Sequence, residues 1–260
     1  MARGDEVIAH RSEEQSPEAI LYSTFFCPFA QRAWIAVESK GVRYQWVSCK
    51  LYGGTPSSKR ALSLAEKRDA TPGFVECSPR GLVPGLRHGD TAVCESIPVI
   101  EYVEEAFPGP ALMPKDPAER AKIRIGLQLF NDIVVRRWYG LLMSPPVAWE
   151  AGRESLSSGF EEIMALFSAE GPFFSRCGFS LFECACLPWM QRTYSVLKHY
   201  RQFSLPQDRF RRLHDWYEAC LRVPGFANTV VDEQRLVDSY GGYANNSANN
   251  NAYELYRKTA

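Results

Sequence analysis

A strand, a helix and a second strand follow one another within residues 19–47, and this sequence feature limits the fold most. Residues 19–23 are an apolar run typical of a strand, and residues 42–47, with Tyr44 and Trp46, are a second strand candidate. Between them, Cys27-Pro28 begins a helical pattern, because proline is favoured in a first helical turn, and Lys40-Gly41 ends it. Strands joined through a helix lie parallel. We therefore expect an α/β layer at the start of the chain.

A hairpin turns this layer into a mixed sheet. Residues 82–86 and 91–94 are strand-like and flank a turn at 87–90, so they predict an antiparallel pair. A helical pattern follows Glu95-Ser96 and ends at Pro108-Gly109-Pro110. We place the end of the first domain there.

Beyond residue 108 the pattern is helical throughout. Asp116-Pro117 starts the first helix, and further helices are expected at 156–167, 181–200 with a bend at Pro188, and 209–221. The Asn-rich segment 241–260 has the composition of a polar tail. The predicted organisation is an extension at 1–17, an α/β domain at 18–108, an all-α domain at 109–240 and the tail at 241–260.

Charge and hydropathy exclude several kinds of partner. Thirty basic and thirty acidic side chains cancel, which removes the long-range attraction that nucleic acid or an anionic membrane surface would exert. The basic turn at 209–214 is typical of a solvated helix face. No segment has the apolar length of a membrane-spanning helix. We expect neither a nucleic-acid nor a membrane partner.

The cysteines indicate a reducing compartment. Residues 1–17 lack the apolar centre of a secretory signal, so we expect a cytoplasmic protein with free thiols. Cys184 and Cys186 are two positions apart in a helical pattern and face different sides, so we expect no metal site. The eight cysteines stand at positions 27, 49, 77, 94, 177, 184, 186 and 220.

Cys27 is the candidate nucleophile. At the start of a helix it faces free backbone amides and the positive end of the helix dipole, which predicts a lowered thiol pKa. Ala30 occupies the position where a dithiol oxidoreductase has its second cysteine. Exchange chemistry at Cys27 therefore needs an external thiol, and glutathione is the abundant one. We interpret the other cysteines as small buried hydrophobic residues.

Two further segments permit either a glutathione-binding or a purely structural interpretation. A cis Pro84 would turn the backbone of Val83 toward an extended peptide, although the dipeptide alone favours the trans form. Glu95-Ser96 could hold the charged end of an amino acid, although local sequence favours a plain helix cap. Both alternatives stay open at this point.

A family resemblance joins these segments. The sequence from Cys27 to Ala36, CPFAQRAWIA, resembles the active-site helix of cysteine-type glutathione transferases of the omega and lambda classes. The matching motifs at 79–84, 95–96, 101–103, 180–183 and 187–189 occur in the order of those families. The resemblance covers roughly residues 19–236. It implies a thioredoxin-like N-terminal domain, which binds glutathione, and an all-α C-terminal domain.

The resemblance also assigns roles. Cys27 would form a mixed disulfide with glutathione, and Arg192 would line the acceptor pocket. The glutathione-binding residues would be Phe29, Leu82, Val83, Pro84, Glu95 and Ser96. The chain departs from the omega pattern by an insertion at about 52–73, so that Lys59 and Lys67 are both candidates for the contact with the glycyl carboxylate. A second departure is Glu183 in place of the usual aspartate of the capping box.

Two functions follow from the resemblance. The first is a glutathione-dependent thiol transferase, which removes glutathione from mixed disulfides or reduces dehydroascorbate. The second is a non-catalytic relative that binds apolar ligands or docks to other proteins. A homodimer is compatible with either function, and no residue decides the oligomeric state.

Overall fold

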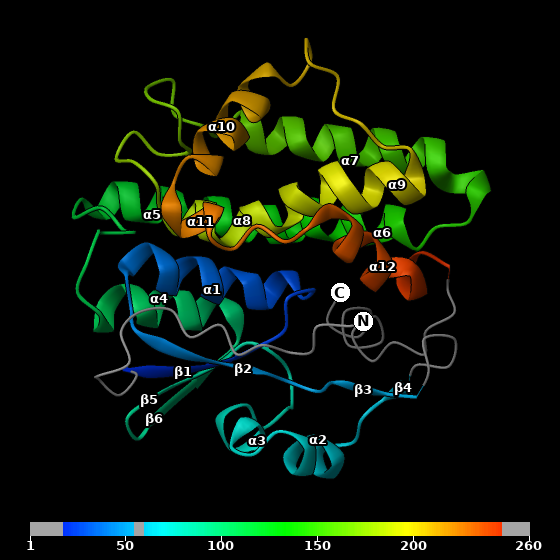
Figure 1. Cartoon of the computed structure of the whole chain (residues 1–260). Coiled ribbons are helices and arrows are strands. Elements are labelled where there is room, and N and C mark those ends of the chain that lie inside the picture. The colour runs from blue at the N-terminus through cyan, green and yellow to red at the C-terminus, as the bar shows by residue number, and fades with distance from the viewer. Residues whose placement is uncertain (1–17, 55–59, 246–260) are drawn as a thin grey trace.

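The computed structural model describes residues 18–54 and 60–245, which form a sheet-containing layer beneath a layer of helices (Figure 1). The main sheet has the strand order β2-β1-β5-β6, with β2 parallel to β1 and the remaining pairs antiparallel. Helices α1 and α4 lie between this sheet and the helical layer, and α2 and α3 cover its other face (Figure 1). The mixed sheet with a separate all-α part confirms the predicted fold class.

The first strand, helix and second strand match the prediction closely. They are β1 (Ala19–Ser23), α1 (Pro28–Lys40) and β2 (Tyr44–Ser48). Cys27 is the N-cap of α1 and Pro28 its first residue. Gly41 ends the helix in the left-handed conformation, with φ 68°, which glycine adopts at low cost.

The predicted hairpin is present, with a tighter turn than expected. It consists of β5 (Gly85–His88) and β6 (Thr91–Cys94), paired from Gly85↔Cys94 to His88↔Thr91. The turn is therefore Gly89-Asp90, and the first two residues assigned to it belong to β5. Helix α4 (Ser96–Ala106) follows β6 directly.

The segment at about 52–73, which was predicted to be an insertion, contains regular secondary structure. A short ribbon of β3 (Tyr52–Gly53) and β4 (Arg60–Ala61) precedes α2 (Leu64–Ala70) and α3 (Phe74–Cys77). Lys59 lies outside the described residues.

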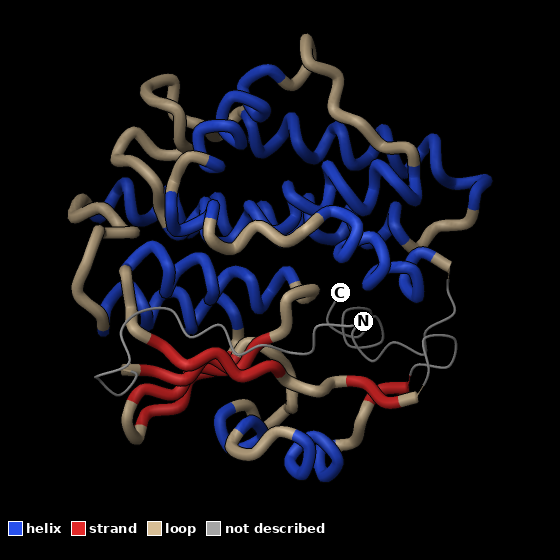
Figure 2. The backbone as a smooth tube through the Cα atoms, in the orientation of Figure 1, coloured by secondary structure: helices blue, strands red, loops and turns tan. Residues whose placement is uncertain are grey.

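The remaining elements are helical, as the tube in Figure 2 shows. The predicted helices are present, but α12 extends into the segment predicted as a polar tail, because Tyr240 and Ala244 are buried. The elements are α5 (Pro117–Leu129), η1 (Phe130–Val135), α6 (Arg136–Leu142), η2 (Pro146–Ala148), α7 (Trp149–Met164), α8 (Leu181–Arg192), η3 (Thr193–Leu197), α9 (Lys198–Arg201), α10 (Arg211–Leu221), α11 (Pro224–Ala227) and α12 (Glu233–Ala244).

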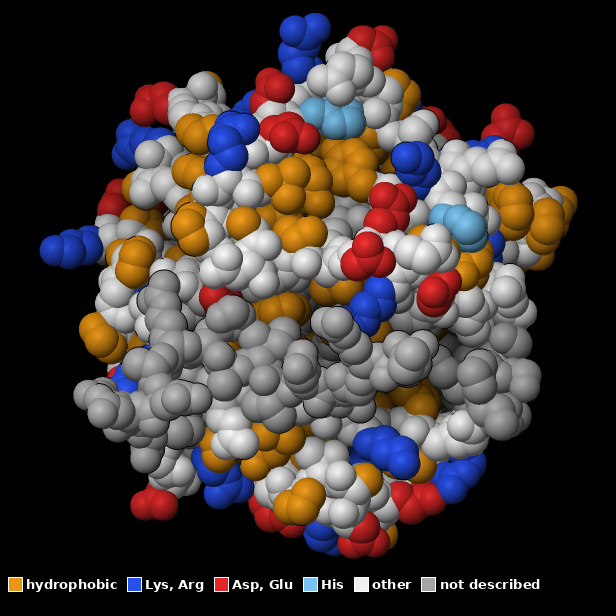
Figure 3. All heavy atoms as spheres, viewed as in Figure 1, with side chains coloured by type: hydrophobic (Ala, Val, Ile, Leu, Met, Phe, Trp, Pro, Cys, Tyr) orange, Lys and Arg blue, Asp and Glu red, His pale blue; other side chains and the backbone are white. Residues whose placement is uncertain are grey.

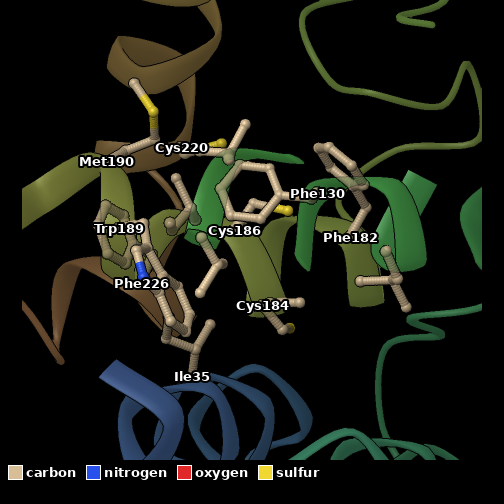
Figure 4. Close-up of a cluster of buried hydrophobic side chains, with 14 of the residues drawn as sticks. Ile35, Phe130, Phe182, Cys184, Cys186, Trp189, Met190, Cys220 and Phe226 are labelled. Carbon is tan, nitrogen blue, oxygen red and sulfur yellow. The ribbon is translucent and has the colours of Figure 1, made fainter. Parts of the chain in front are cut away.

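Helix α8 is the centre of the helical layer, and all its residues are buried. It begins with a capping box in which the Glu183 carboxylate accepts hydrogen bonds from the Ser180 backbone N–H and hydroxyl, at 2.8 and 2.7 Å. The glutamate therefore closes the box, as predicted. Figure 4 shows side chains of α8 packing with Ile35 of α1, and Cys184 and Cys186 lie inside this cluster.

The surface carries both charge signs. Figure 3 shows basic and acidic side chains interspersed over one face of the molecule. Arg209, from the basic turn, pairs with Glu154 and Glu161 at 3.1 and 2.6 Å, and Arg212 donates to the Phe173 carbonyl at 2.8 Å. Arg209 and Arg212 of the basic turn therefore bind other residues of the same chain. Among residues 18–54 and 60–245, no helix combines the length and apolar character needed to cross a membrane.

Candidate functional site

A cavity of about 440 Å³ lies between the end of the sheet layer and the helical layer. Its walls come from the start of α1, the segment before β5, the start of α4, and helices of the all-α part. The predicted residues that line it are Cys27, Phe29, Leu82, Val83, Pro84, Glu95 and Ser96. The fold thus brings together residues spread over seventy positions of the sequence.

Cys27 lies at the wall of this cavity with its side chain partly exposed. Burial raises the pKa of the Cys27 thiol above its ordinary value, and the Ala30 amide, the Arg192 guanidinium and the Phe29 amide lower it only in part. The backbone amides at the helix start therefore lower the thiol pKa, as predicted, but burial raises it by more. The prediction of a lowered pKa is wrong for this site, because loss of solvent around the sulfur outweighs the amides and the arginines.

Glu95 and Ser96 occupy the turn between β6 and α4. Glu95 has φ 68°, which is unusual for a residue with a side chain, and it is the N-cap of α4 without a capping hydrogen bond from its carboxylate. That carboxylate instead pairs with Arg80 at 3.0 Å, and the pair is exposed. Ser96 is the first helical residue, and its hydroxyl accepts from Arg32 at 3.2 Å. Glu95 is therefore the helix cap by position, without a side-chain capping hydrogen bond, and the glutathione-binding role of the pair stays a prediction.

The peptide bond between Val83 and Pro84 is cis. The dipeptide alone favours the trans form, and the structure overturns that expectation. Leu82, Val83 and Pro84 together form the cavity wall. The Ser78 hydroxyl supports this segment by donating to the Leu82 carbonyl at 2.6 Å.

Arg192 is not in the predicted acceptor pocket. Its side chain is fully buried behind the wall, and it is not among the residues that line the cavity. It donates to the Tyr240 hydroxyl at 2.9 Å and to the backbone carbonyls of Phe26 and Phe25 at 3.0 and 3.4 Å. Arg192 thus ties α8 to the loop that ends at Cys27.

Polar side chains of α1 reach across to the helical layer in the same way. Arg32 donates to the Ala185 carbonyl at 2.9 Å and to Asn131 Oδ1 at 2.6 Å, and its guanidinium lies 4.4 Å from the Trp189 ring. Burial lowers the pKa of Arg32 to about 10. The Gln31 amide donates to Gln191 at 3.0 Å. These bonds fix the Cys27 helix against the all-α part of the chain.

Basic groups also line the cavity. Of the two lysines considered from sequence, Lys67 lines the cavity, where its ammonium donates to the Gly81 carbonyl at 2.9 Å. Burial lowers the pKa of Lys67. Arg80 also lines the cavity. The cavity that Cys27 lines is therefore also lined by charged groups of both signs.

The aromatic wall on the helical side was missed from sequence. It is formed from the β3 ribbon, α6 and α12, where the Tyr52 and Tyr243 hydroxyls share a hydrogen bond of 3.2 Å. The spacing of these tyrosines in the sequence does not distinguish residues that line a cavity from residues of the hydrophobic core. The lining residues that sequence reasoning did not single out include Phe26, Tyr52, Asn131, Arg136, Tyr139, Met143, Tyr240 and Tyr243.

The described residues were also compared with the requirements of a metal site. Within residues 18–54 and 60–245, no group of three or more histidine, cysteine, aspartate or glutamate side chains is placed to hold a metal ion.

Comparison with known proteins finds similarity to glutathione transferases. A family model described as "Glutathione S-transferase, N-terminal domain" matches residues 21–111. The first domain of the chain therefore matches the N-terminal domain of glutathione transferases. The chain is 29% identical over 220 residues to glutathione S-transferase L3 of Arabidopsis thaliana, which covers 85% of each chain.

Solved glutathione transferase structures share the whole fold. Glutathione transferase Omega 3C from Trametes versicolor superposes with a TM-score of 0.72 at 24% identity, covering 91% of this chain and 94% of that one. Dehydroascorbate reductase from Chlamydomonas reinhardtii superposes with a TM-score of 0.62 at 20% identity, covering 86% and 98%. The predicted resemblance to omega- and lambda-like transferases is confirmed at the level of family and fold.

Proposed function

We propose that the protein is a cytoplasmic glutathione-dependent thiol transferase that acts through Cys27. The observation that carries the proposal is a partly exposed thiol at a helix start, on the wall of a cavity that charged groups of both signs also line. The structural likeness to a dehydroascorbate reductase supports a related activity. Glutathione is the proposed co-substrate, and the site needs no metal for this chemistry.

We propose a role in glutathione binding for each predicted binding residue. The Glu95 carboxylate takes the ammonium of the γ-glutamyl end, and the α4 amides with the Ser96 hydroxyl take its carboxylate. The backbone of Val83 pairs with the cysteinyl residue, beside Leu82 and Pro84. Phe29 closes the side of the groove. Lys67 binds the glycyl carboxylate, and its lowered pKa is a cost that this carboxylate offsets.

The reaction exchanges one disulfide for another. The Cys27 thiolate attacks the glutathione sulfur of a glutathionylated substrate, so a Cys27–glutathione disulfide forms and the substrate leaves as a thiolate that takes up a proton. A second glutathione thiolate then attacks this disulfide, which releases glutathione disulfide and regenerates Cys27. With dehydroascorbate, the same two glutathione thiols supply two electrons and two protons to the substrate.

The raised pKa of Cys27 is compatible with this scheme. A thiol of higher pKa forms less thiolate at neutral pH, but each thiolate is a stronger nucleophile. We therefore expect turnover that increases with pH above neutrality.

A non-catalytic ligand-binding module is the second candidate. The aromatic wall formed by Tyr52, Tyr139 and Tyr243, together with the raised Cys27 pKa, favours this alternative. An apolar molecule could occupy this part of the cavity without any reaction at the sulfur. The homodimer stays a prediction for both candidates, and light scattering after size-exclusion chromatography tests it.

The Cys27→Ser variant separates the two functions. Turnover of a glutathione mixed disulfide should be lost in this variant, whereas binding of an apolar fluorescent dye should remain. Cys177→Ser is the matched control, because Cys177 is exposed and outside the cavity. If wild-type protein binds the dye but turns over no mixed disulfide, the ligand-binding function replaces the enzyme.

A further inference from the structure

Cys77 and Cys94 lie on the same face of the sheet, on either side of Gly85. Gly85 of β5 pairs directly with Cys94 of β6. A Cβ atom added to Gly85 would lie 3.0 Å from the Cys77 sulfur and 3.6 Å from its Cβ atom. The missing side chain of this glycine therefore leaves the space that Cys77, at the end of α3, fills.

The alternation of the strand determines where Cys94 points. Val93 packs into the core beneath α1 and α4, as does its partner Leu86. Neighbouring residues of a strand face opposite sides, so Cys94 faces the side of α3, as Gly85 does. Directly paired residues have Cβ atoms about 4.5–5.5 Å apart. The Cys77 sulfur is also 3.9 Å from the carbonyl oxygen of Val93, the residue before Cys94.

The surroundings give the two thiols different roles. Cys94 is partly exposed, whereas Cys77 is buried. Burial raises the pKa of Cys77 to about 11, and the nearby Arg87 guanidinium lowers it in part. Within the described residues, Arg87 Nε is buried without a hydrogen-bond partner. Cys94 is thus the thiol that a dissolved oxidant can reach first.

We propose that Cys77 and Cys94 form a second redox site, separate from Cys27, that closes into an intramolecular disulfide when it meets a small disulfide such as glutathione disulfide. The Cys94 thiolate attacks one sulfur of glutathione disulfide, and one glutathione leaves as a thiolate. Cys77 then loses its proton and attacks the Cys94 sulfur, which releases the second glutathione. Two protein thiols are oxidised and one disulfide is reduced to two thiols.

The new bond would join two segments of the cavity wall. Ser78, which follows Cys77, supports Leu82, and Glu95 with Ser96 follow Cys94 directly. A link between positions 77 and 94 therefore ties the residues before β5 to the start of α4. This site does not depend on the proposed reaction at Cys27.

Peptide mapping after oxidation tests the proposal. The full-length Cys27→Ser protein is incubated with glutathione disulfide, the remaining thiols are blocked, and non-reduced peptides are analysed by mass spectrometry. We expect a peptide linked through Cys77 and Cys94. With Cys77→Ser added, we expect a glutathione adduct that accumulates on Cys94, because the resolving thiol is gone. With Cys94→Ser added, Cys77 should remain unmodified.

Cys49→Ser is the matched control, since Cys49 is a buried cysteine of the same small core as Cys77. This variant should form the 77–94 link at the wild-type rate. A stable glutathione adduct on Cys94 in a protein that retains Cys77 would overturn the proposal. So would a link from Cys49 to Cys77, or two unmodified thiols at 77 and 94 while exposed Cys177 reacts.

Discussion

Replacement of Arg192 by methionine tests whether this buried arginine holds the loop that precedes Cys27. Arg192→Met keeps much of the side-chain volume but removes the donors to Tyr240, to the Gln31 amide oxygen and to the carbonyls of Phe25 and Phe26. It also removes a positive charge that lowers the Cys27 pKa. We expect a less stable protein with a less reactive thiol.

The expected loss of stability follows from the groups left without this donor. Phe26 O keeps a hydrogen bond from the Tyr240 hydroxyl at 3.1 Å, so the main losses are at the Gln31 and Phe25 oxygens. A buried acceptor left unsatisfied costs about 1–3 kcal/mol, and the Phe25 contact is long, so the free energy of unfolding should fall by about 2–4 kcal/mol. For a chain of this size, that is a decrease in Tm of about 4–16 °C.

Urea unfolding and thiol alkylation measure the two effects. Arg192→Lys keeps the charge but loses the planar fork, so it should lose stability while it retains more of the Cys27 reactivity. Arg211→Met is the matched surface control, since Arg211 is exposed. At pH 7.5, alkylation of Cys27 should slow by about threefold to tenfold in Arg192→Met, because an opposite charge nearby shifts a pKa by about 1 unit or less at moderate distance. An Arg192→Met protein with wild-type stability and an unchanged alkylation rate would refute this reasoning.

Three further results are expected. Because burial raises the Cys27 pKa, the alkylation rate of Cys27 should keep rising with pH by up to about tenfold per unit from pH 7 to 9, and a plateau below pH 8 would contradict this direction. Lys67→Met should weaken glutathione binding by about tenfold or more in calorimetry, since a hydrogen bond to a charged group contributes about 1.5–3 kcal/mol; an unchanged affinity would remove Lys67 from the site. Gly109→Ala should lower Tm by several degrees, because Gly109 has φ 127° and a Cβ there would collide with the Lys40 carbonyl oxygen; a wild-type Tm would show that the turn can shift.

The sequence predicted the elements that local chemistry defines. Pro28 and Gly41 mark the two ends of α1, and the capping box from Ser180 to Glu183 marks the start of α8, since each signal depends only on backbone groups within a few residues. The β3–β4 ribbon was not predicted, because strands of two residues carry no periodic pattern. Helix α12 was not predicted, and its last residues were assigned to the tail, because Tyr240 packs against Arg192, which is distant in sequence.

Site residues that belong to short contiguous motifs could be predicted from the sequence. Features that arise only when distant segments pack together could not. Cys27, Val83 and Glu95 all reach the cavity, since each belongs to a short motif on its wall. The direction of the Cys27 pKa was predicted wrongly, because a sequence shows the helix start but not the loss of solvent around the sulfur. Arg192 was assigned to the pocket, whereas its position behind the wall depends on how α8 packs against α1.

The buried side chains of α1 limit how this protein can be recombined with its relatives. Gln31 and Arg32 end their hydrogen bonds on Gln191, Ala185 and Asn131, all in the all-α part. A chimera that takes residues 18–108 from this chain and its helices from another transferase would leave an amide and a guanidinium facing unmatched groups in its interior. Such hybrids should fold only when the donor of the helices also supplies side-chain acceptors at positions 131 and 191, because the acceptor at Ala185 is a backbone carbonyl.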